Sequence, residues 1–367
     1  MRRTRSDRTS RPASGIETRK REHLERVANA QEPAGRDGTW LDCVHLVHQA
    51  LPESAFEDLD IRTEFAGRAF DAPLFVTGMT GGTPEAREIN QGLARVATRL
   101  GIGFGLGSQR AMIEDPALGE TYEVRREAPT VFLAGNIGGV QLARLRLEQI
   151  RDALRRVGAD ALCVHLNPAQ ELAQPEGDRD FRGVARAIAC AVEGLGLPVI
   201  VKEVGCGLSR EAGVALRDLG VRFVDVAGAG GTSWVEIEMD RAGLRGDPEW
   251  EALRGWGVPT AASLLEMDGL GFEVIASGGI RNGVQAARAI ALGATLVGVA
   301  APALRAWFHG GEVAVEDRLR RLLHGLKVAM LLTGCRNVAD LRDAPRVLMG
   351  PLAEWARARC GDSSVRG

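Results

Sequence analysis

The chain has 367 residues, of which 45% are hydrophobic and 46 are glycine, which is enough for a large core with many tight turns. Its formal net charge of −2 gives no electrostatic argument for nucleic acid or an anionic membrane as a partner. Apolar runs stay shorter than the roughly 18 residues that a membrane-spanning helix needs, so the sequence predicts no membrane span.

The cysteine and lysine contents are also informative. Six cysteines occur without a Cys-x-x-Cys pair and without a histidine cluster at zinc-ligand spacing, which predicts reduced, mostly buried thiols in a cytoplasmic protein. Only Lys20, Lys202 and Lys327 are lysines among 46 basic residues, so the first two are candidates for a specific role, whereas Lys327 lies in an apolar helical stretch.

At the N-terminus, residues 1–18 hold five arginines, three serines and almost nothing apolar, which predicts a disordered basic tail. No apolar stretch typical of a secretory signal follows. A short amphipathic helix is expected from Arg19 to about Ala30, as the first element of a single domain spanning residues 19–360.

From residue 70 onward, one pattern repeats eight times: a short apolar strand, a glycine-rich or polar exit, and a helix. Pro84 stands at the expected first position of the first of these helices. The eight predicted strands are residues 73–77, 103–106, 131–134, 161–166, 198–201, 223–226, 273–276 and 295–299.

Eight such units favour an α/β fold, a (β/α)8 TIM barrel with an N-terminal helical extension and its site at the carboxyl ends of the strands. A doubly wound sheet is the alternative. No Gly-x-Gly-x-x-Gly fingerprint follows the first strand, and polar residues follow nearly all strands instead of one switch point, so the barrel is preferred.

Two of the exits predict a phosphate site. Gly278-Gly279-Ile280-Arg281 and Ala300-Ala301 follow the seventh and eighth strands, where small residues let backbone N–H groups approach an anion. Glycines there could also serve only to turn the chain.

The fifth exit begins with Lys202, which strand geometry points into the barrel mouth. It could face an anion or an electron-rich ring, form a Schiff base, or pair with Glu203 or Asp225. The uncharged hydrogen-bonding groups on the other exits suit a planar heteroaromatic such as a flavin; they are Met79, Thr80, Ser108, Asn136 and Thr232.

A second sector of the rim carries Arg110, His165, Asn167 and the carboxylate of Glu171. Donors beside one carboxylate suit a diphosphate held partly through Mg2+, although His165 could be a core histidine and Glu171 a solvated acid. Cys206, between two glycines, is a weaker candidate for a nucleophile. The longest connection, Ser233 to Gly257, could be a lid or a subunit contact.

Taken together, these motifs resemble those of type 2 isopentenyl diphosphate isomerases, in order and over roughly residues 19–350. The similarity rests on Arg-Lys-x-Glu-His at 19–23, Met-Thr-Gly-Gly at 79–82, Gly-Ser-Gln-Arg at 107–110, Gly-Asn-Ile-Gly at 135–138, His-x-Asn-x-x-Gln-Glu at 165–171, Pro-Glu-Gly-Asp-Arg at 175–179, Val-Lys-Glu-Val-Gly at 201–205, Gly-Gly-Thr at 230–232 and Gly-Gly-Ile-Arg at 278–281.

The resemblance implies an isomerase that interconverts isopentenyl and dimethylallyl diphosphate by a 1,3-proton shift, with reduced FMN as acid and base, Mg2+ on the diphosphate and NADPH as flavin reductant. It also implies a homotetramer or homo-octamer. FMN would be held by Gly78, Met79, Thr80, Ser108, Asn136, Lys202, Thr232, Gly279, Ile280, Arg281, Ala300 and Ala301.

On the same resemblance, Glu171 would bind Mg2+ and Gln170 would be catalytic by orienting the alkene. The substrate would contact Arg19, Lys20, Ser108, Gln109, Arg110, His165, Asn167 and Gln170. Two alternatives stay open. One is an FMN-dependent oxidoreductase of the hydroxy-acid oxidase or nucleotide dehydrogenase type, and the other is a non-catalytic flavin or isoprenoid-diphosphate sensor.

Overall fold

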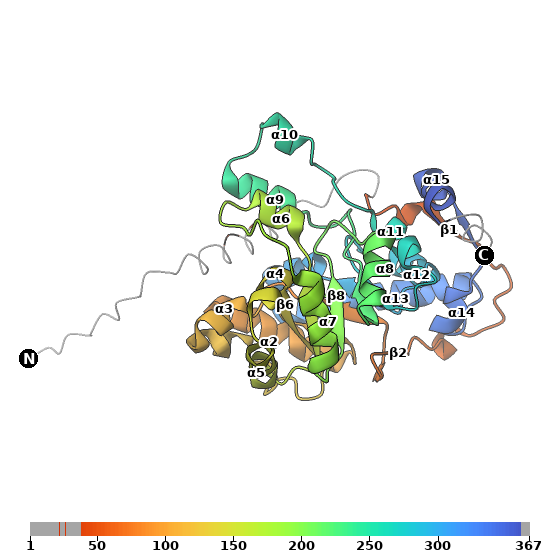
Figure 1. The fold of residues 1–367 in the computed structure, drawn as a ribbon. Helices are drawn as coiled ribbons and strands as arrows, with labels where there is room; N and C mark the ends of the chain where they lie inside the picture. The colour runs from red at the N-terminus through yellow and green to blue at the C-terminus, as the bar shows by residue number, and fades with distance from the viewer. Residues whose placement is uncertain (1–21, 23–25, 27–37, 361–367) are drawn as a thin grey trace, which may run out of the picture.

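The computed structural model describes Glu22, Arg26 and residues 38–360 (Figure 1). The expected tail at residues 1–18 and the expected diphosphate-binding pair Arg19 and Lys20 lie outside the described residues.

Eight parallel strands form a closed barrel in the order β10-β11-β4-β5-β6-β7-β8-β9. The pairing of β11 with β4 closes the sheet, so the predicted (β/α)8 barrel is confirmed and the doubly wound alternative is wrong. The strands are β4 (Leu74–Val76), β5 (Gly103–Gly105), β6 (Leu133–Gly138), β7 (Ala161–His165), β8 (Val199–Lys202), β9 (Phe223–Asp225), β10 (Glu273–Ala276) and β11 (Leu296–Val299).

The strand bounds differ most from the prediction at β6. The apolar run at 131–134 was expected to end before a glycine-rich exit, but β6 continues to Gly138 and pairs with β7 along its length. Asn136 is therefore a strand residue, in register with Cys163 of β7, and not part of a loop.

Helices surround the barrel, as Figure 1 shows. The first, α2, begins with the predicted Pro84, and the Thr83 side chain accepts a hydrogen bond from the backbone N–H of Ala86. The helices are α2 (Pro84–Arg99), α3 (Arg110–Glu114), α4 (Gly139–Arg144), α5 (Leu147–Val157), α6 (Pro168–Ala173), α7 (Val184–Gly194), α8 (Arg210–Asp218), α9 (Trp234–Ala242), α10 (Pro248–Glu251), α11 (Thr260–Met267), α12 (Gly283–Ala291), α13 (Ala301–Leu332), α14 (Val338–Arg342) and α15 (Gly350–Arg359), with 3-10 turns η1 (Leu41–Cys43), η2 (Phe56–Asp58) and η3 (Pro116–Tyr122).

A hairpin of β2 (Thr63–Phe65) and β3 (Arg68–Phe70) closes the end of the barrel where the strands begin. Phe65 is fully buried, and its ring lies edge-on to Phe132 and Phe223, with centroid distances of 6.4 and 5.4 Å. This aromatic plug leaves only the opposite end, where the strands terminate, open for a site.

Outside the barrel, β1 (Val44–Leu46) pairs antiparallel with β12 (Arg346–Leu348). The long α13 is interrupted at Gly310 and Gly311, and Gly311 has a φ of 61°, which favours glycine. Within the part of the chain that the structure describes, no helix is long and apolar enough to cross a membrane.

Candidate active site

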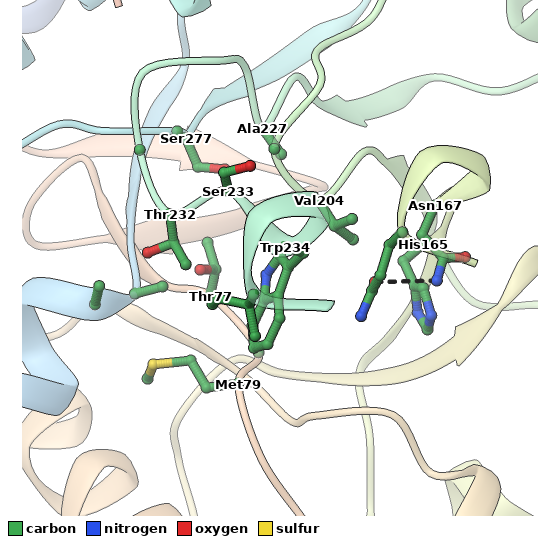
Figure 2. A pocket seen from close by; sticks show the side chains of 18 of the residues that line it. Thr77, Met79, His165, Asn167, Val204, Ala227, Thr232, Ser233, Trp234 and Ser277 are labelled. Atoms are coloured by element: carbon green, nitrogen blue, oxygen red, sulfur yellow. Dashed lines mark hydrogen bonds between the residues drawn. The ribbon is translucent and has the colours of Figure 1, made fainter. Parts of the chain in front are cut away.

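A cavity of about 650 Å³ lies at the carboxyl ends of the strands, and residues following all eight strands line it. Every residue expected to hold FMN lines this cavity, as do Glu171 and five of the residues expected to bind substrate, namely Ser108, Arg110, His165, Asn167 and Gln170. In Figure 2, His165 and Asn167 lie on one side of the pocket, Thr232 and Met79 lie on the other, and the Trp234 ring lies between them.

Gln109 is not brought to the cavity. It is 2% exposed, and its amide nitrogen donates to the carbonyl of Ala153 at 3.2 Å while its amide oxygen accepts from the backbone N–H of Asn136 at 2.9 Å. The structure thus gives Gln109 a supporting position beneath the exits, contrary to the expectation of substrate contact.

Lys202 ends β8 and is buried in the barrel mouth. Its ammonium nitrogen lies 3.5 Å from a carboxylate oxygen of Asp225, which is one of the pairings considered from the sequence. The hydroxyl of Ser277 donates to the same carboxylate at 2.6 Å. Because the ion pair is almost fully desolvated, each charge depends on the other.

The predicted phosphate sector is built from closely packed glycines. Gly278 and Gly279 have φ values of 100° and 86°, and a Cβ added at Gly279 would lie 2.5 Å from the carbonyl oxygen of Gly230. The backbone can adopt this path only without side chains. The N-terminus of α13 at Ala301 lines the same sector, and a helix N-terminus favours anions.

The loop that carries Ser108 is fixed by the only tyrosine of the chain. The hydroxyl of the fully buried Tyr122 donates to the carbonyl of Ser108 at 2.7 Å. Burial raises the pKa of this phenol, so it stays a donor. Gly81 lies against the ring. A Cβ added at Gly81 would lie 2.0 Å from a ring carbon, so this position has no room for a side chain.

His165 and Asn136 form a polar pair on neighbouring strands. The ring nitrogen Nδ1 of His165 lies 2.8 Å from Oδ1 of Asn136, and the amide nitrogen of Asn136 donates to the carbonyl of Leu106 at 3.0 Å. His165 lines the cavity, so the structure does not support its alternative as a histidine of the apolar core.

The short helix α6 presents the second polar cluster. The Asn167 amide nitrogen donates to Gln170 and to Glu171, each at 3.1 Å, and the second oxygen of Glu171 accepts from the backbone N–H of Asp178 at 2.8 Å. Glu171 is 7% exposed, so it is not an ordinary solvated acid. Among the described residues, no group of three or more histidine, cysteine or acidic side chains could hold a metal by itself.

Helix α9 forms a wall of the cavity that the sequence did not predict. It lies beside α6 above the barrel (Figure 1), and Trp234 and Ile237 line the cavity. Glu238 is fully buried, and the Gln170 amide lies 3.5 Å from its carboxylate. Arg241 pairs with Glu238 and also with Glu22 at 3.0 Å.

The sequence feature that could have predicted helix α9 is Ser233, which caps its N-terminus. Ser233 accepts a hydrogen bond from the backbone N–H of Glu236, so a helix begins directly after the sixth exit. The connection from 233 to 257 was expected to be a lid or a subunit contact, and the structure shows that its first part lines the cavity.

Cys206 is a poor nucleophile in this environment. Burial, with a smaller contribution from the carboxylate of Glu203, raises the pKa of its thiol to about 12. All six cysteines are free, but only Cys163 and Cys335 are buried, so the expectation of mostly buried thiols is wrong.

Comparison with known proteins places this site in context. Residues 183–347 match the sequence profile of FMN-dependent dehydrogenases. The chain is 48% identical to an isopentenyl-diphosphate delta-isomerase of Aeropyrum pernix over 93% of this chain and 92% of the relative. It is 43% identical to one of Ignicoccus hospitalis over 93% of this chain and 96% of that protein.

Among solved structures, a mandelate oxidase variant with an FMN adduct aligns over 90% of this chain and 98% of its own, with a TM-score of 0.61 and 16% identity. A putative lactate oxidase of Pediococcus acidilactici aligns over 95% of this chain and 98% of its own, with a TM-score of 0.63 and 15% identity. At 15–16% identity, the similarity shows that these proteins share the barrel fold with this chain and shows nothing about their functions in common.

Proposed function

Because the chain belongs to the isopentenyl-diphosphate delta-isomerase family, we propose that it interconverts isopentenyl and dimethylallyl diphosphate by a 1,3-proton shift, with reduced FMN as acid and base. The observation that carries the proposal is the cavity itself. It joins a glycine-rich sector suited to a flavin phosphate with a second sector of donors and one buried carboxylate suited to a diphosphate.

The residues present fit FMN. Thr80 has a buried hydroxyl oxygen without a hydrogen-bond partner among the described residues, and it lines the cavity, so a ligand atom there would satisfy it. Gly279, Ile280 and the start of α13 would hold the phosphate, and Lys202 would face the ring.

The residues also fit Mg2+ in one specific way. Glu171 is the carboxylate of the polar sector, and Mg2+ commonly uses one or two protein carboxylates and takes its other ligands from phosphate and water. Glu171 would thus anchor the ion together with the diphosphate oxygens, while the Asp178 N–H and the Asn167 amide keep the carboxylate in place.

The remaining substrate contacts divide by the part of the substrate that they would meet. Arg110, His165 and Asn167 line the sector beside Glu171 and would bind the diphosphate, while Gln170 would orient the alkene end. Arg19 and Lys20, by family resemblance, would add positive charge to the diphosphate. Anchoring the diphosphate far from the reacting carbons lets binding energy position them.

The reaction adds a proton at the terminal alkene carbon and removes one from the allylic carbon, through a state with tertiary carbocation character. Bound reduced flavin would supply the proton-transferring atoms for both steps. The chain's own part is positioning and the exclusion of water. Trp234 and Ile237 line the cavity, and Asn167 and Glu238 hold the Gln170 amide between them.

Further parts of the proposal concern the setting of the reaction. NADPH would keep the flavin reduced, the chain would act as a homotetramer or homo-octamer, and its location would be the cytoplasm, which the six free thiols support.

The test is anaerobic. Purified protein with FMN, NADPH, Mg2+ and isopentenyl diphosphate is followed for dimethylallyl diphosphate and for NADPH loss. Product in large molar excess over NADPH consumed is expected, and Gln170→Ala should lower kcat by at least about a hundredfold without loss of FMN, as expected for a group acting in the reaction.

The FMN-dependent dehydrogenase match favours one alternative, a flavin oxidoreductase. That function requires a hydride-transfer base, and His165 is the only histidine among the described residues that line the cavity. NADPH consumption in a one-to-one ratio with another substrate, without isomerisation, would establish the oxidoreductase in place of the isomerase.

A further inference from the structure

The contact between the side chains of Asn136 and His165 affects how the His165 ring can bind a ligand. We propose that Asn136 fixes the proton of the neutral His165 ring on Nδ1, so that a diphosphate bound at His165 draws a further proton onto Nε2. Asn136 is then a positioning residue, and diphosphate binding is coupled to proton uptake. The identity of the ligand rests on the proposed function, whereas the position of the proton on the ring does not.

The orientation of the Asn136 amide follows from its other partner. Its side chain lies 3.0 Å from the carbonyl oxygen of Leu106, and because a carbonyl oxygen only accepts, the amide nitrogen must face it. The amide oxygen therefore faces His165, 2.8 Å from Nδ1. Since this oxygen only accepts, Nδ1 must carry a hydrogen in the neutral ring as well as in the charged ring.

The backbone of Asn136 is held in place, so its amide reaches Leu106 and His165 from a fixed position. The residue lies inside β6 and is 6% exposed. Its backbone exchanges two hydrogen bonds with Gln109: the Asn136 N–H donates to the Gln109 side-chain oxygen at 2.9 Å, and the Gln109 N–H donates to the Asn136 carbonyl at 2.8 Å. The buried Gln109 thus holds the residue that in turn holds His165.

A neutral ring with its hydrogen on Nδ1 has a lone pair on Nε2. A lone pair cannot donate to a phosphate oxygen, so a diphosphate is bound through Nε2 only by the imidazolium form, which adds a donor and a positive charge together. Imidazole titrates close to neutral pH, so the required proton is accessible.

Some charged groups near His165 favour a positive charge on its ring, and others oppose one. Lys202 of β8 is paired with His165 in the strand register, and Arg110 of α3 lines the same cavity; both oppose another positive charge. The carboxylate of Glu171 on α6 lines the same cavity and favours one. The Cys163 thiol on the same strand is neutral, because burial raises its pKa to about 12. A diphosphate adds negative charge and shifts this balance towards the imidazolium.

The position of the proton is tested by 15N NMR of the FMN-loaded protein at about pH 8, where a free imidazole is mostly neutral. His165→Gln identifies the signal, and the expected pattern is a hydrogen on Nδ1. In Asn136→Ala, the ring should move towards the Nε2–H form that free histidine prefers. A wild-type ring with its hydrogen on Nε2 would overturn the proposal, whatever the protein binds.

The proton uptake is tested by titrating the FMN-loaded protein with Mg2+ and inorganic diphosphate in two buffers of different ionisation enthalpy. Wild-type protein should take up about one proton more per site than His165→Gln at about pH 8, and the difference should fall towards zero as the solution approaches about pH 5. His324→Gln is the control, because His324 packs on Phe56 outside the cavity and should leave the uptake unchanged.

The outcomes separate the two proposals. Binding with equal proton uptake in wild type and His165→Gln would overturn the coupling and leave the isomerase function standing. No binding of diphosphate at all would contradict both the diphosphate function and the coupling, while the NMR result would still decide what Asn136 does. If Asn136→Ala loses its flavin, the wild-type NMR spectrum alone still shows whether the hydrogen of His165 lies on Nδ1.

Discussion

The buried pair of Lys202 and Asp225 supports a first prediction about single residues. Asp225→Asn leaves the ammonium without its carboxylate in a desolvated site, which should destabilise the protein by about 3–5 kcal/mol. Urea unfolding followed by circular dichroism measures this change. The double variant Lys202→Met with Asp225→Asn should recover much of the loss, since no unpaired charge then remains.

The control for that experiment is an exposed pair. Arg217 and Asp218 lie 2.9 Å apart with both side chains about half exposed or more, so Asp218→Asn should cost less than about 1 kcal/mol. If Asp225→Asn were no more destabilising than Asp218→Asn, Lys202 would not depend on this carboxylate.

The thiol of Cys206 gives a prediction about pH. Its pKa is raised to about 12, so the thiol stays protonated through the neutral range, and its alkylation should become fast only as the pH rises towards that value. Cys190 is exposed and serves as the internal reference. Mass spectrometry after iodoacetamide treatment at about pH 8 should find Cys190 modified well before Cys206. Equal rates would mean that Cys206 is ionised and would reopen its role as a nucleophile.

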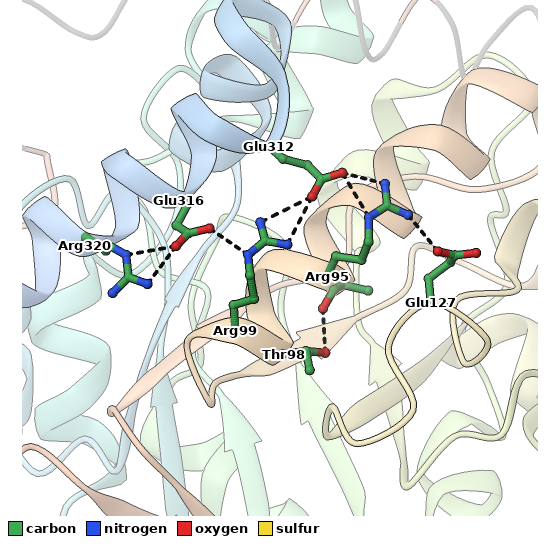
Figure 3. Close-up of polar contacts among 8 residues, drawn as sticks. Arg95, Thr98, Arg99, Glu127, Glu312, Glu316 and Arg320 are labelled. Carbon is green, nitrogen blue, oxygen red and sulfur yellow. Dashed lines mark hydrogen bonds and ion pairs between the residues drawn. The ribbon is translucent and has the colours of Figure 1, made fainter.

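Between elements, a network of ion pairs joins α2 to α13 just beyond the Gly310–Gly311 interruption (Figure 3). Arg95 pairs with Glu312 at 2.6 Å, and Arg99 pairs with Glu316 at 2.7 Å. The hydrogen bond from Arg95 lowers the pKa of the Glu312 carboxyl. Because α13 begins at the cavity, this network fixes the part of the helix that follows the site.

The sign of its pH dependence follows from the lowered pKa. The stabilisation is present above the unfolded-state pKa and is lost as the pH falls through the lower folded-state pKa. Glu312→Gln should therefore cost roughly 0.5–1 kcal/mol at neutral pH. The difference from wild type should shrink as the pH falls below the ordinary glutamate pKa of about 4.3 towards the lowered folded-state pKa, and it should also shrink in about 1 M salt. Thermal unfolding across pH values measures it.

Asp317→Asn is the matched control, because Asp317 pairs with Arg321 within α13 at 2.8 Å and joins no second element among residues 38–360. It should change stability less than Glu312→Gln. A Glu312→Gln effect that persisted unchanged at acidic pH would show that packing, not the charge, connects the two helices.

The elements also show what the sequence could predict. Each barrel strand is a short apolar run followed by polar residues, because both faces of a parallel strand are buried until the strand ends, and this pattern located all eight. Strand ends were less certain. The glycines after Ala134 were consistent with a turn, but they also allow close strand approach, so β6 runs on through Asn136 to Gly138.

The site was predictable where a motif residue follows a strand and faces the barrel mouth. Gln109 failed this rule because it lies at the helix entry, where its side chain turns inward to Ala153 and Asn136. The wall built by Trp234 and Ile237 depends on how α9 packs on α6, a tertiary contact that the capping residue Ser233 does not specify.

At the scale of the whole molecule, the two ends of the barrel should be separable in experiment. The β2–β3 hairpin fills one end with Phe65 and Phe70, whereas the cavity lies at the other. In barrels of this kind, residues at the strand starts serve stability and residues at the strand ends serve function. The described chain from 38 to 360 is also expected to unfold as one unit, because the hairpin rings pack on strands from across the barrel.

Phe65→Ala tests both expectations. Removing this buried ring should lower the free energy of unfolding by about 3–5 kcal/mol, since it leaves a cavity against Phe132 and Phe223. FMN affinity and kcat/KM should stay within about twofold of wild type at a temperature where the variant is folded. Gln170→Ala should show the reverse, a large loss of kcat with little change in stability. If Phe65→Ala lost flavin while still folded, or if circular dichroism and tryptophan fluorescence gave separate transitions, the two ends would not belong to one cooperative barrel.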